Sequence, residues 1–237
     1  MPYEFYYWPH VQGRGEFVRL ALEEAGAPYI DVARVEGPEV LKRVLEARFL
    51  RPPFAPPFLK VRMHLIGQTT NILLYLGERH GLAPKSDAGR LWTNQIQLTI
   101  GDFSLEAHDT HHPLGPRLQF EEQATEAMKR AAWFREERLE RFLGWFENIL
   151  SQNASVPPHL VGARLTYADI SLFQTVEGLR YAFPKAMRRA ERRYPRVIAL
   201  HDLVASRPRI RAYLASERRI GFHERAGLFR HHAELDG

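Results

Sequence analysis

The chain changes character near residue 85, and this change limits which folds it can adopt. Residues 1–83 mix strand-like and helix-like patterns, whereas residues 88–215 show helical periodicity almost throughout. The connection between them is short, polar and marked by Pro84. We therefore predict two domains: a mixed α/β domain over residues 1–83 and an all-α helical bundle over residues 88–237.

The first domain is predicted to have the order βαβ, a loosely structured link, and then ββα. Strands are expected at residues 3–8, 29–32, 58–61 and 65–66, where aromatic and β-branched side chains gather. One helix is expected from about residue 16 to a stop at Gly26, and another from Gly67 to Gly81. This order brings the end of the first strand next to a glycine-rich turn.

Three patterns in the second domain predict helices. A stripe with helical spacing runs through Leu91, Gln95, Leu98 and Asp102. A longer helix is expected over residues 121–150. Thr166 and Asp169 form a variant capping box, which predicts the start of a buried helix.

Composition excludes several kinds of function. None of the 237 residues is Cys, so disulfide scaffolds, cysteine-ligated metals and a protein thiol nucleophile are impossible. The net charge is +5, but the arginines of residues 188–196 have few interleaved aromatic side chains, so we expect a solvated helix face and no nucleic-acid partner. No signal peptide or long apolar segment is visible, which predicts a cytoplasmic protein without a membrane partner.

Several motifs follow one another in an order that resembles the cytosolic glutathione transferases. In chain order they are Tyr7-Trp8, Gly13-Arg14-Gly15-Glu16-Phe17-Val18-Arg19-Leu20, Ala55-Pro56-Pro57-Phe58-Leu59, Gln68-Thr69 and the Thr166–Asp169 box. The resemblance covers residues 3–214 and is greatest to the tyrosine-type enzymes, in a form that looks bacterial. It implies a thioredoxin-like first domain, a homodimer, and transfer of glutathione to a hydrophobic electrophile. Glutathione-dependent peroxide reduction or isomerisation, and non-catalytic glutathione binding, stay open as alternatives.

The resemblance implies that Tyr7 and Arg14 are the catalytic pair. A thiol has a reference pKa of about 8.5, and lowering it to about 6.5 takes roughly 2.7 kcal/mol of preferential stabilisation of the thiolate. A tyrosine hydroxyl can donate one hydrogen bond to that anion, and a guanidinium adds favourable charge. Tyr6 is the alternative, and strand alternation allows only one of the two tyrosines to face the site.

The resemblance also assigns residues to the binding of glutathione itself. Trp8 follows the catalytic tyrosine. Pro56 precedes a proline that resembles the family's cis-proline, and it offers the peptide only a carbonyl because it has no N–H; a plain polyproline link is the alternative. Gln68 and Thr69 lie at a helix N-terminus, where a carboxylate binds, or else they only cap that helix.

Two charged positions complete the predicted glutathione site. Asp102 resembles an acidic residue that reaches across a dimer interface to the γ-glutamyl ammonium, with an ion pair inside one chain as the alternative. Lys42 is the candidate for the glycine carboxylate. Arg43, Arg48 and Arg51 lie in the same variable segment.

A histidine-rich segment follows the helix that bears Asp102. Histidines and carboxylates at close spacing are typical zinc ligands, but the segment does not combine a pair on one helix face with a distant third ligand. Pro113 predicts a helix end, where histidines would complement the helix dipole. We expect no metal, and we assign His108 and His111 to the pocket of the second substrate, with a solvated helix end as the alternative.

Overall fold

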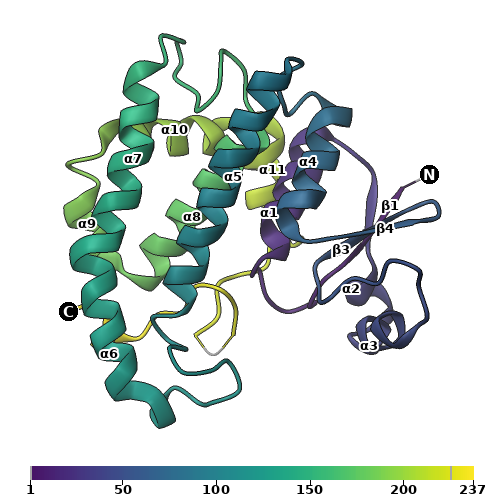
Figure 1. Cartoon of the computed structure of the whole chain (residues 1–237), viewed down its shortest axis with the longest axis horizontal. Helices are drawn as coiled ribbons and strands as arrows, with labels where there is room; N and C mark the ends of the chain where they lie inside the picture. Colours follow the sequence, from purple (N-terminus) through teal and green to yellow (C-terminus); the bar gives the residue numbers. More distant parts are fainter. Residues whose placement is uncertain (1, 225) are drawn as a thin grey trace.

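The structure is a computed structural model that describes residues 2–224 and 226–237. A four-stranded sheet with the order β2-β1-β3-β4 lies at one side of the molecule (Figure 1). Its strands are β1 (Tyr3–Tyr6), β2 (Tyr29–Asp31), β3 (Phe58–Val61) and β4 (His64–Gly67). β1 pairs with β2 in parallel and with β3 antiparallel, as a βαβ unit followed by a hairpin requires. The second strand is one residue shorter than predicted, because Val32 already begins a helix.

Helices cover both faces of this sheet. The helices of the first domain are α1 (Gly15–Ala25), α2 (Val32–Glu36), α3 (Glu39–Glu46) and α4 (Thr69–His80). Phe5 and Leu59 belong to the cluster that includes α1 and α4, whereas Tyr6 and Phe58 pack with α2 and α3. The alternation of side chains along β1 therefore sends neighbouring aromatic residues to opposite layers.

Left-handed glycines end the two long helices of the first domain. Gly26 follows α1 with φ 61°, and Gly81 follows α4 with φ 70°. Both glycines donate their backbone N–H to carbonyls of the last helical turn. α4 ends at His80 and α5 begins at Asp87, so a short segment joins the sheet region to the helical region.

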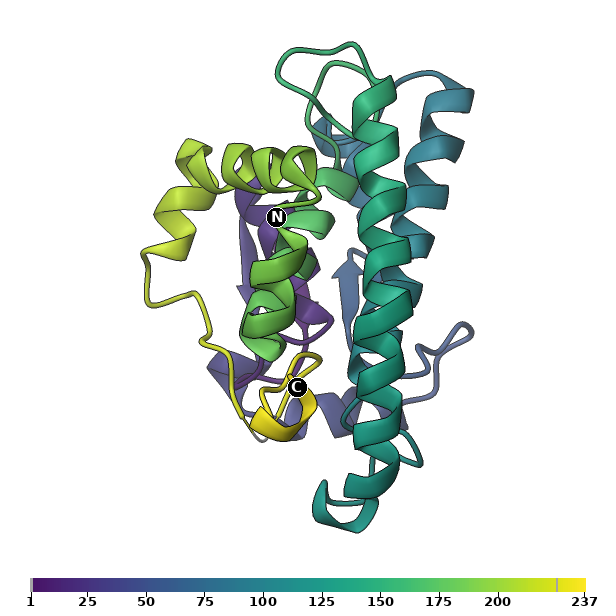
Figure 2. The same ribbon diagram turned by 90° about the vertical axis from the view of Figure 1, so that its left-hand side faces the viewer.

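The rest of the chain is helical. Its α-helices are α5 (Asp87–His108), α6 (Ala124–Trp133), α7 (Leu139–Gln152), α8 (Tyr167–Ala182), α9 (Pro184–Ala190), α10 (Pro195–Ser206) and α11 (Pro208–Leu214). A single π-helical turn, η2 (Phe134–Arg138), joins α6 to α7, so the segment predicted as one helix is continuous but not uniformly α-helical. The short 3-10 turn η1 (Glu121–Gln123) precedes α6, and a second one, η3 (Ala233–Leu235), lies near the C-terminus. Figure 2 shows α6 and α7 as one tall column beside α8 and α9.

The predicted stripe on α5 faces outward. Leu91 is 71% exposed and Leu98 is 53% exposed, while the buried face carries Ile96, Ile100 and Phe103. The stripe and the buried face have the same helical period, but they are displaced from one another around the helix axis. The predicted helix is therefore confirmed, and the stripe marks its outer face.

The capping box of α8 is present as predicted. The Asp169 carboxylate accepts the backbone N–H of Thr166 at 2.6 Å and that of Leu160 at 2.8 Å. Asp169 is fully buried, so these N–H groups replace the water that its carboxylate loses. The box fixes the start of a helix that is buried along most of its length.

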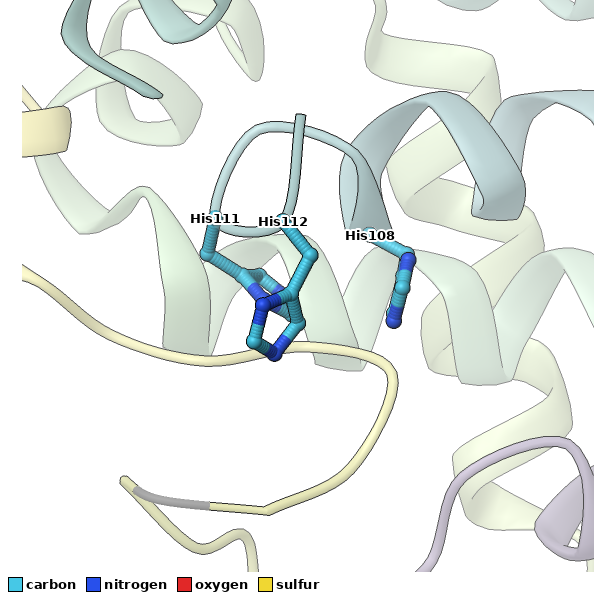
Figure 3. Close-up of side chains that lie close together, drawn as sticks. All are labelled: His108, His111 and His112. Atoms are coloured by element: carbon cyan, nitrogen blue, oxygen red, sulfur yellow. The ribbon is translucent and has the colours of Figure 1, made fainter. Parts of the chain in front are cut away.

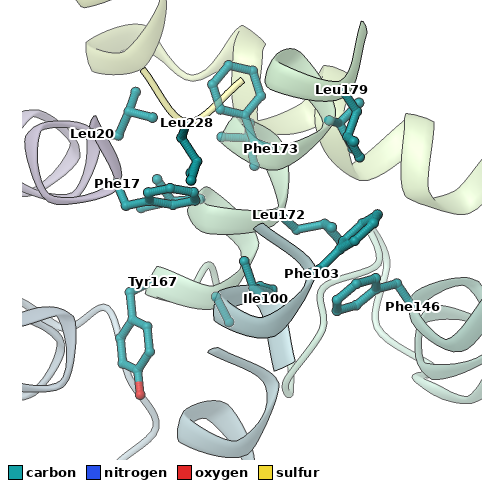
Figure 4. Close-up of a cluster of buried hydrophobic side chains, with 14 of the residues drawn as sticks. Phe17, Leu20, Ile100, Phe103, Phe146, Tyr167, Leu172, Phe173, Leu179 and Leu228 are labelled. Carbon is teal, nitrogen blue, oxygen red and sulfur yellow. The ribbon is translucent and has the colours of Figure 1, made fainter. Parts of the chain in front are cut away.

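The two regions share one hydrophobic core. Figure 4 shows Phe17 and Leu20 of α1 facing Phe173 of α8, with Leu228 of the C-terminal tail between them. Phe103 of α5 stacks on Phe142 of α7 with ring centroids 4.4 Å apart. In the described residues, no helix is both long enough and apolar enough to cross a bilayer.

Candidate active site between the sheet and the helical region

Tyr7 lies just past the end of β1 and is buried against the α1 side of the sheet. Only 7% of its surface is exposed. Tyr6 points to the other layer and stacks on Phe58 at a centroid separation of 4.8 Å. Of the two candidate tyrosines, only Tyr7 lies on the side of the glycine-rich turn.

The turn Gly13-Arg14-Gly15 closes over the Tyr7 ring. The Tyr7 hydroxyl accepts the backbone N–H of Arg14 at 2.9 Å. A methyl group on Gly13 would lie 2.2 Å from the hydroxyl oxygen, and one on Gly15 would lie 2.4 Å from a ring carbon. Gly13 also has φ +45°. Glycine is therefore required here both by backbone conformation and by the close approach of the ring.

The Tyr7 hydroxyl is held in its protonated form. Burial raises the pKa of Tyr7, although the Arg14 N–H and the Arg19 guanidinium oppose that rise. Because the hydroxyl oxygen accepts from Arg14, its own proton stays available to an acceptor. The group is thus a hydrogen-bond donor rather than a base at neutral pH.

A buried network of charged residues lies in α1, directly after this turn. Sequence reasoning did not find it. Arg19 has no exposed side-chain surface and donates from Nε to Asp31 at 2.8 Å. Glu16 is also fully buried; it accepts the Tyr213 hydroxyl at 2.7 Å and pairs with Arg219. The sequence signal was available, since an acidic residue and an arginine stand three positions apart among the apolar residues at the start of α1.

A small cavity of about 50 Å³ lies where the turn, α4 and α5 meet. Residues predicted to bind glutathione line one side of it, namely Arg14, Gln68 and Thr69. The Thr69 hydroxyl donates to the Arg14 carbonyl at 3.4 Å, and Gln68 has φ +68°, an unusual conformation for a residue with a side chain. Leu228 of the C-terminal tail lines the cavity as well.

The opposite side of this cavity carries two polar groups that sequence reasoning did not find. Gln97 and Ser104 of α5 are 2% and 3% exposed. In the described part of the chain, the Gln97 side-chain carbonyl and the Ser104 hydroxyl have no hydrogen-bond partner. Unpartnered buried polar groups are costly, and a water molecule or a ligand in this cavity would satisfy these two.

Other predicted site residues do not line this cavity. Trp8 is 48% exposed. Lys42 is exposed on α3 and lies 3.9 Å from Glu46. The Pro56–Pro57 peptide is cis, as predicted. Asp102 lies on the outer face of α5, in a separate groove of about 870 Å³ between α5 and α7 that Arg138 and Trp145 also line.

Three histidines gather where α5 ends (Figure 3). His108 Nδ1 lies 3.2 Å from the Asp109 carboxylate. His111 Nε2 lies 3.2 Å from the Leu228 carbonyl, so this nitrogen carries the proton and donates it. His112 Nδ1 accepts the Gln123 side-chain amide at 2.9 Å. The pKa of His111 falls to about 2 and that of His112 to about 4, mainly through burial, so both rings are neutral at pH 7.

Comparison with known proteins agrees with this architecture. The fold places the chain in the class of proteins with a thioredoxin-like first region and an all-α second region. A solved prostaglandin synthase D of Nilaparvata lugens matches with a TM-score of 0.70 and 20% identity over 92% of this chain and 98% of that one. A Necator americanus glutathione S-transferase described as monomeric matches with a TM-score of 0.69 and 21% identity, covering 94% of this chain and all of that one. The predicted fold class is confirmed.

Sequence comparison finds similarity to one family of proteins. Residues 108–217 match the family model "Glutathione S-transferase, C-terminal domain". The curated relatives include a Plasmodium falciparum glutathione S-transferase, 21% identical over 90% of this chain and 95% of its own length. A Xenopus laevis glutathione S-transferase P 1 is 28% identical over 92% of this chain and 93% of its own. The second region of the chain is therefore similar to the C-terminal domain of glutathione S-transferases, and relatives of that name resemble most of its length. These named relatives are eukaryotic and do not support a bacterial subfamily.

Proposed function

We propose that this protein is a tyrosine-type glutathione transferase that activates the thiol of glutathione for attack on an electrophilic small molecule. The observation that carries the proposal is the Tyr7 hydroxyl. It is buried, protonated and oriented by the Arg14 N–H, next to a cavity lined by Arg14, Gln68 and Thr69. The matching family model and the relatives support the same activity.

In this proposal, residues 1–83 bind glutathione and residues 88–237 supply the pocket of the second substrate. The carboxylate of the γ-glutamyl group lies at the N-terminus of α4, where Thr69 and free backbone N–H groups favour an anion. Pro56 offers its carbonyl to the cysteinyl residue, and Trp8 and Lys42 bind the remainder of the peptide. These three assignments rest on the motif match alone.

Tyr7 and Arg14 then act on the sulfur. Tyr7 donates its hydroxyl proton as a hydrogen bond to the thiolate, and the Arg14 guanidinium adds favourable charge. The thiol proton leaves to solvent. The thiolate sulfur forms a bond to the electrophilic carbon, while the leaving group departs with the electron pair of the bond that breaks. Proximity of the two bound reactants supplies the rest of the rate enhancement.

We also propose a homodimer in which Asp102 reaches the glutathione of the partner subunit. Asp102 is exposed, lies in an open groove and does not line the cavity of its own chain. Leu50 and Phe54 are 94% and 92% exposed in the segment after α3, as expected of residues that a second chain covers. Asp102→Ala is expected to weaken glutathione binding while sedimentation still reports a dimer. Unchanged affinity would refute this role for Asp102.

A pH titration of the thiolate absorbance of bound glutathione tests the proposed activity directly. We expect the bound thiol to ionise well below about 8.5, the reference pKa of a thiol. Glutathione that binds without a lowered pKa would contradict thiol activation and favour a non-catalytic glutathione-binding protein. If the pKa is lowered, profiling with peroxides and isomerisable substrates separates transfer from the other two reactions. A cytoplasmic location is part of the same proposal.

A further inference from the structure

We propose that His108, His111 and His112 form a binding site for a first-row divalent transition-metal ion, such as Zn²⁺, at the end of α5. This site is additional to the thiol-activating machinery and does not depend on it. The three residues are close in sequence but are not arranged on one helix face. α5 ends at His108, and the following turn brings the rings of His111 and His112 back beside it (Figure 3).

The three rings are close enough to share one ion. With one ring nitrogen taken from each residue, the three nitrogens all lie within 4.8 Å of one another. Zinc binds imidazole nitrogen at about 2.0–2.1 Å, so tetrahedral ligands lie about 3.4 Å apart. Small changes in side-chain torsion angles would bring the three nitrogens to that spacing. His111 and His112 are 1% and 6% exposed, so these two rings have already lost their solvent before an ion binds.

Hydrogen bonds already determine which nitrogen carries the proton in two of the rings. His108 presents Nδ1 to the Asp109 carboxylate, which favours a proton on Nδ1 and a lone pair on Nε2. His111 donates from Nε2 to the Leu228 carbonyl, so its lone pair is on Nδ1, which is buried without a hydrogen-bond partner among the described residues. A carboxylate or a backbone carbonyl behind the imidazole is the usual arrangement of a metal-bound histidine.

Metal binding by His112 requires a change in the position of its ring proton. Its Nδ1 accepts from the Gln123 amide, whose orientation is fixed because its carbonyl accepts the N–H of Leu114 at 3.0 Å. The proton of His112 is therefore on Nε2, the nitrogen that is buried without a partner in the described structure. Binding through Nε2 requires this proton to move to Nδ1 or to leave. A hydrogen-bond acceptor at position 123 would remove that cost.

The neighbouring charges select the kind of metal. Asp109 is the carboxylate in contact with the cluster, whereas the Arg230 guanidinium acts on all three rings and opposes a second cation. Mg²⁺ and Ca²⁺ need several oxygen ligands and little competing positive charge, and the site offers neither. Ions that form strong bonds to neutral imidazole, such as Zn²⁺, Co²⁺, Ni²⁺ and Cu²⁺, fit better.

The position of the cluster links this site to the cavity. Ser104, which lines the cavity, precedes His108 by one helical turn, and Leu228 both lines the cavity and binds His111. An ion held by the cluster would fasten the end of α5 to the C-terminal tail that covers the cavity. Three protein ligands also leave a fourth position for water, as in catalytic zinc sites.

Titration of the metal-stripped full-length chain with Co²⁺, in the absence of glutathione, tests the site. We expect one equivalent per chain and a visible absorption band typical of tetrahedral nitrogen ligands. His108→Ala is expected to weaken binding by more than about 100-fold, the upper end of what losing an outer hydrogen-bond partner of a ligand costs. His10→Ala is the matched control, because His10 is exposed and outside the cluster, and its affinity is expected to equal that of the wild type.

Gln123→Glu supplies a second variant whose expected effect on the affinity for Co²⁺ has the opposite sign. A carboxylate at this position accepts the Nδ1 proton of His112 and is expected to tighten Co²⁺ binding by about 10-fold. Absence of stoichiometric binding to the wild type would overturn the proposal. Binding that His108→Ala and Gln123→Glu leave unchanged would also overturn it. None of these results bears on thiol activation, which the glutathione titration measures separately.

Discussion

The two walls of the cavity are stabilised in opposite ways. On the wall from the first domain, Tyr7 accepts from Arg14. The buried ions Glu16 and Arg19 have partners on β2, on α11 and in the segment after α11. On the wall from α5, buried polar atoms of Gln97 and Ser104 lack partners in the described structure. The charged side chains of the first wall are thus paired, although Arg19 Nη2 and one Asp31 oxygen have no partner in the described structure, whereas Gln97 and Ser104 each present an unpartnered polar atom to the cavity.

This difference is consistent with separate roles for the two walls in stabilising the thiolate and in binding the second substrate. A hydroxyl that stabilises a thiolate must hold one position, and a network of partnered charges fixes it there before the ligand arrives. A wall that receives varied second substrates benefits from groups that bind only when a substrate is present. Unpartnered groups lower the stability of the free protein by about 1–3 kcal/mol each, so this adaptability has a measurable cost.

The largest effect is expected from breaking the ion pairs of the first-domain wall. Arg19→Met leaves the buried Glu16 and the largely buried Asp31 without their shared cation, which typically costs about 3–5 kcal/mol of stability. Urea unfolding measures the change. Arg43→Met is the matched control: it breaks an ion pair with Glu36 in which the arginine is 68% exposed, and it is expected to cost less than about 1 kcal/mol. Equal losses in the two variants would show that the network does not stabilise this wall.

A smaller effect, on rate rather than stability, is expected from Tyr7→Phe. A hydrogen bond to a charged group contributes about 1.5–3 kcal/mol, so kcat/KM for a fixed electrophile is expected to fall about 10- to 100-fold. Glutathione should still bind, because Arg14, Gln68 and Thr69 are unchanged. Tyr6→Phe is the control, since Tyr6 lies on the opposite face and donates to Glu4. Turnover that is unaffected by Tyr7→Phe would rule out this tyrosine as the donor to the sulfur.

The first-domain wall was the easier one to predict from the sequence. Its elements depend on short-range patterns: an aromatic strand, a glycine-rich turn and a helix with a left-handed glycine stop. The family resemblance implied that Tyr7, Arg14, Gln68 and Thr69 are site residues, and the structure brings the last three to one cavity. The network beneath was missed because Tyr213 and Arg219 are about 200 positions from Glu16 in sequence.

The α5 wall was harder to predict because the sequence does not determine which face of the helix is buried. Leu91 and Leu98 have the helical period of a buried stripe, yet they are exposed, and the buried face includes the polar residues Gln97 and Ser104. Hydrophobicity alone cannot select the face when polar side chains face a cavity. The histidine cluster was discounted for a related reason: the turn after His108 gathers the rings, and sequence spacing does not encode that turn.

The smallest predicted effect tests whether the α5 wall is truly unsatisfied. Ser104→Ala removes a buried hydroxyl that has no partner among the described residues, so the free energy of unfolding without ligand is expected to rise by about 1 kcal/mol, the low end of the cost of an unpartnered buried group. Thr93→Val, on the same helix, removes a hydroxyl that donates to the Gly89 carbonyl at 2.8 Å, and it is expected to lose about 1 kcal/mol. The two variants should therefore shift stability in different directions. If Ser104→Ala is as destabilising as Thr93→Val, the Ser104 hydroxyl has a partner in solution, and the contrast between the two walls fails. If it is not, a fall in kcat/KM for electrophiles with polar groups would show that substrate is the missing partner.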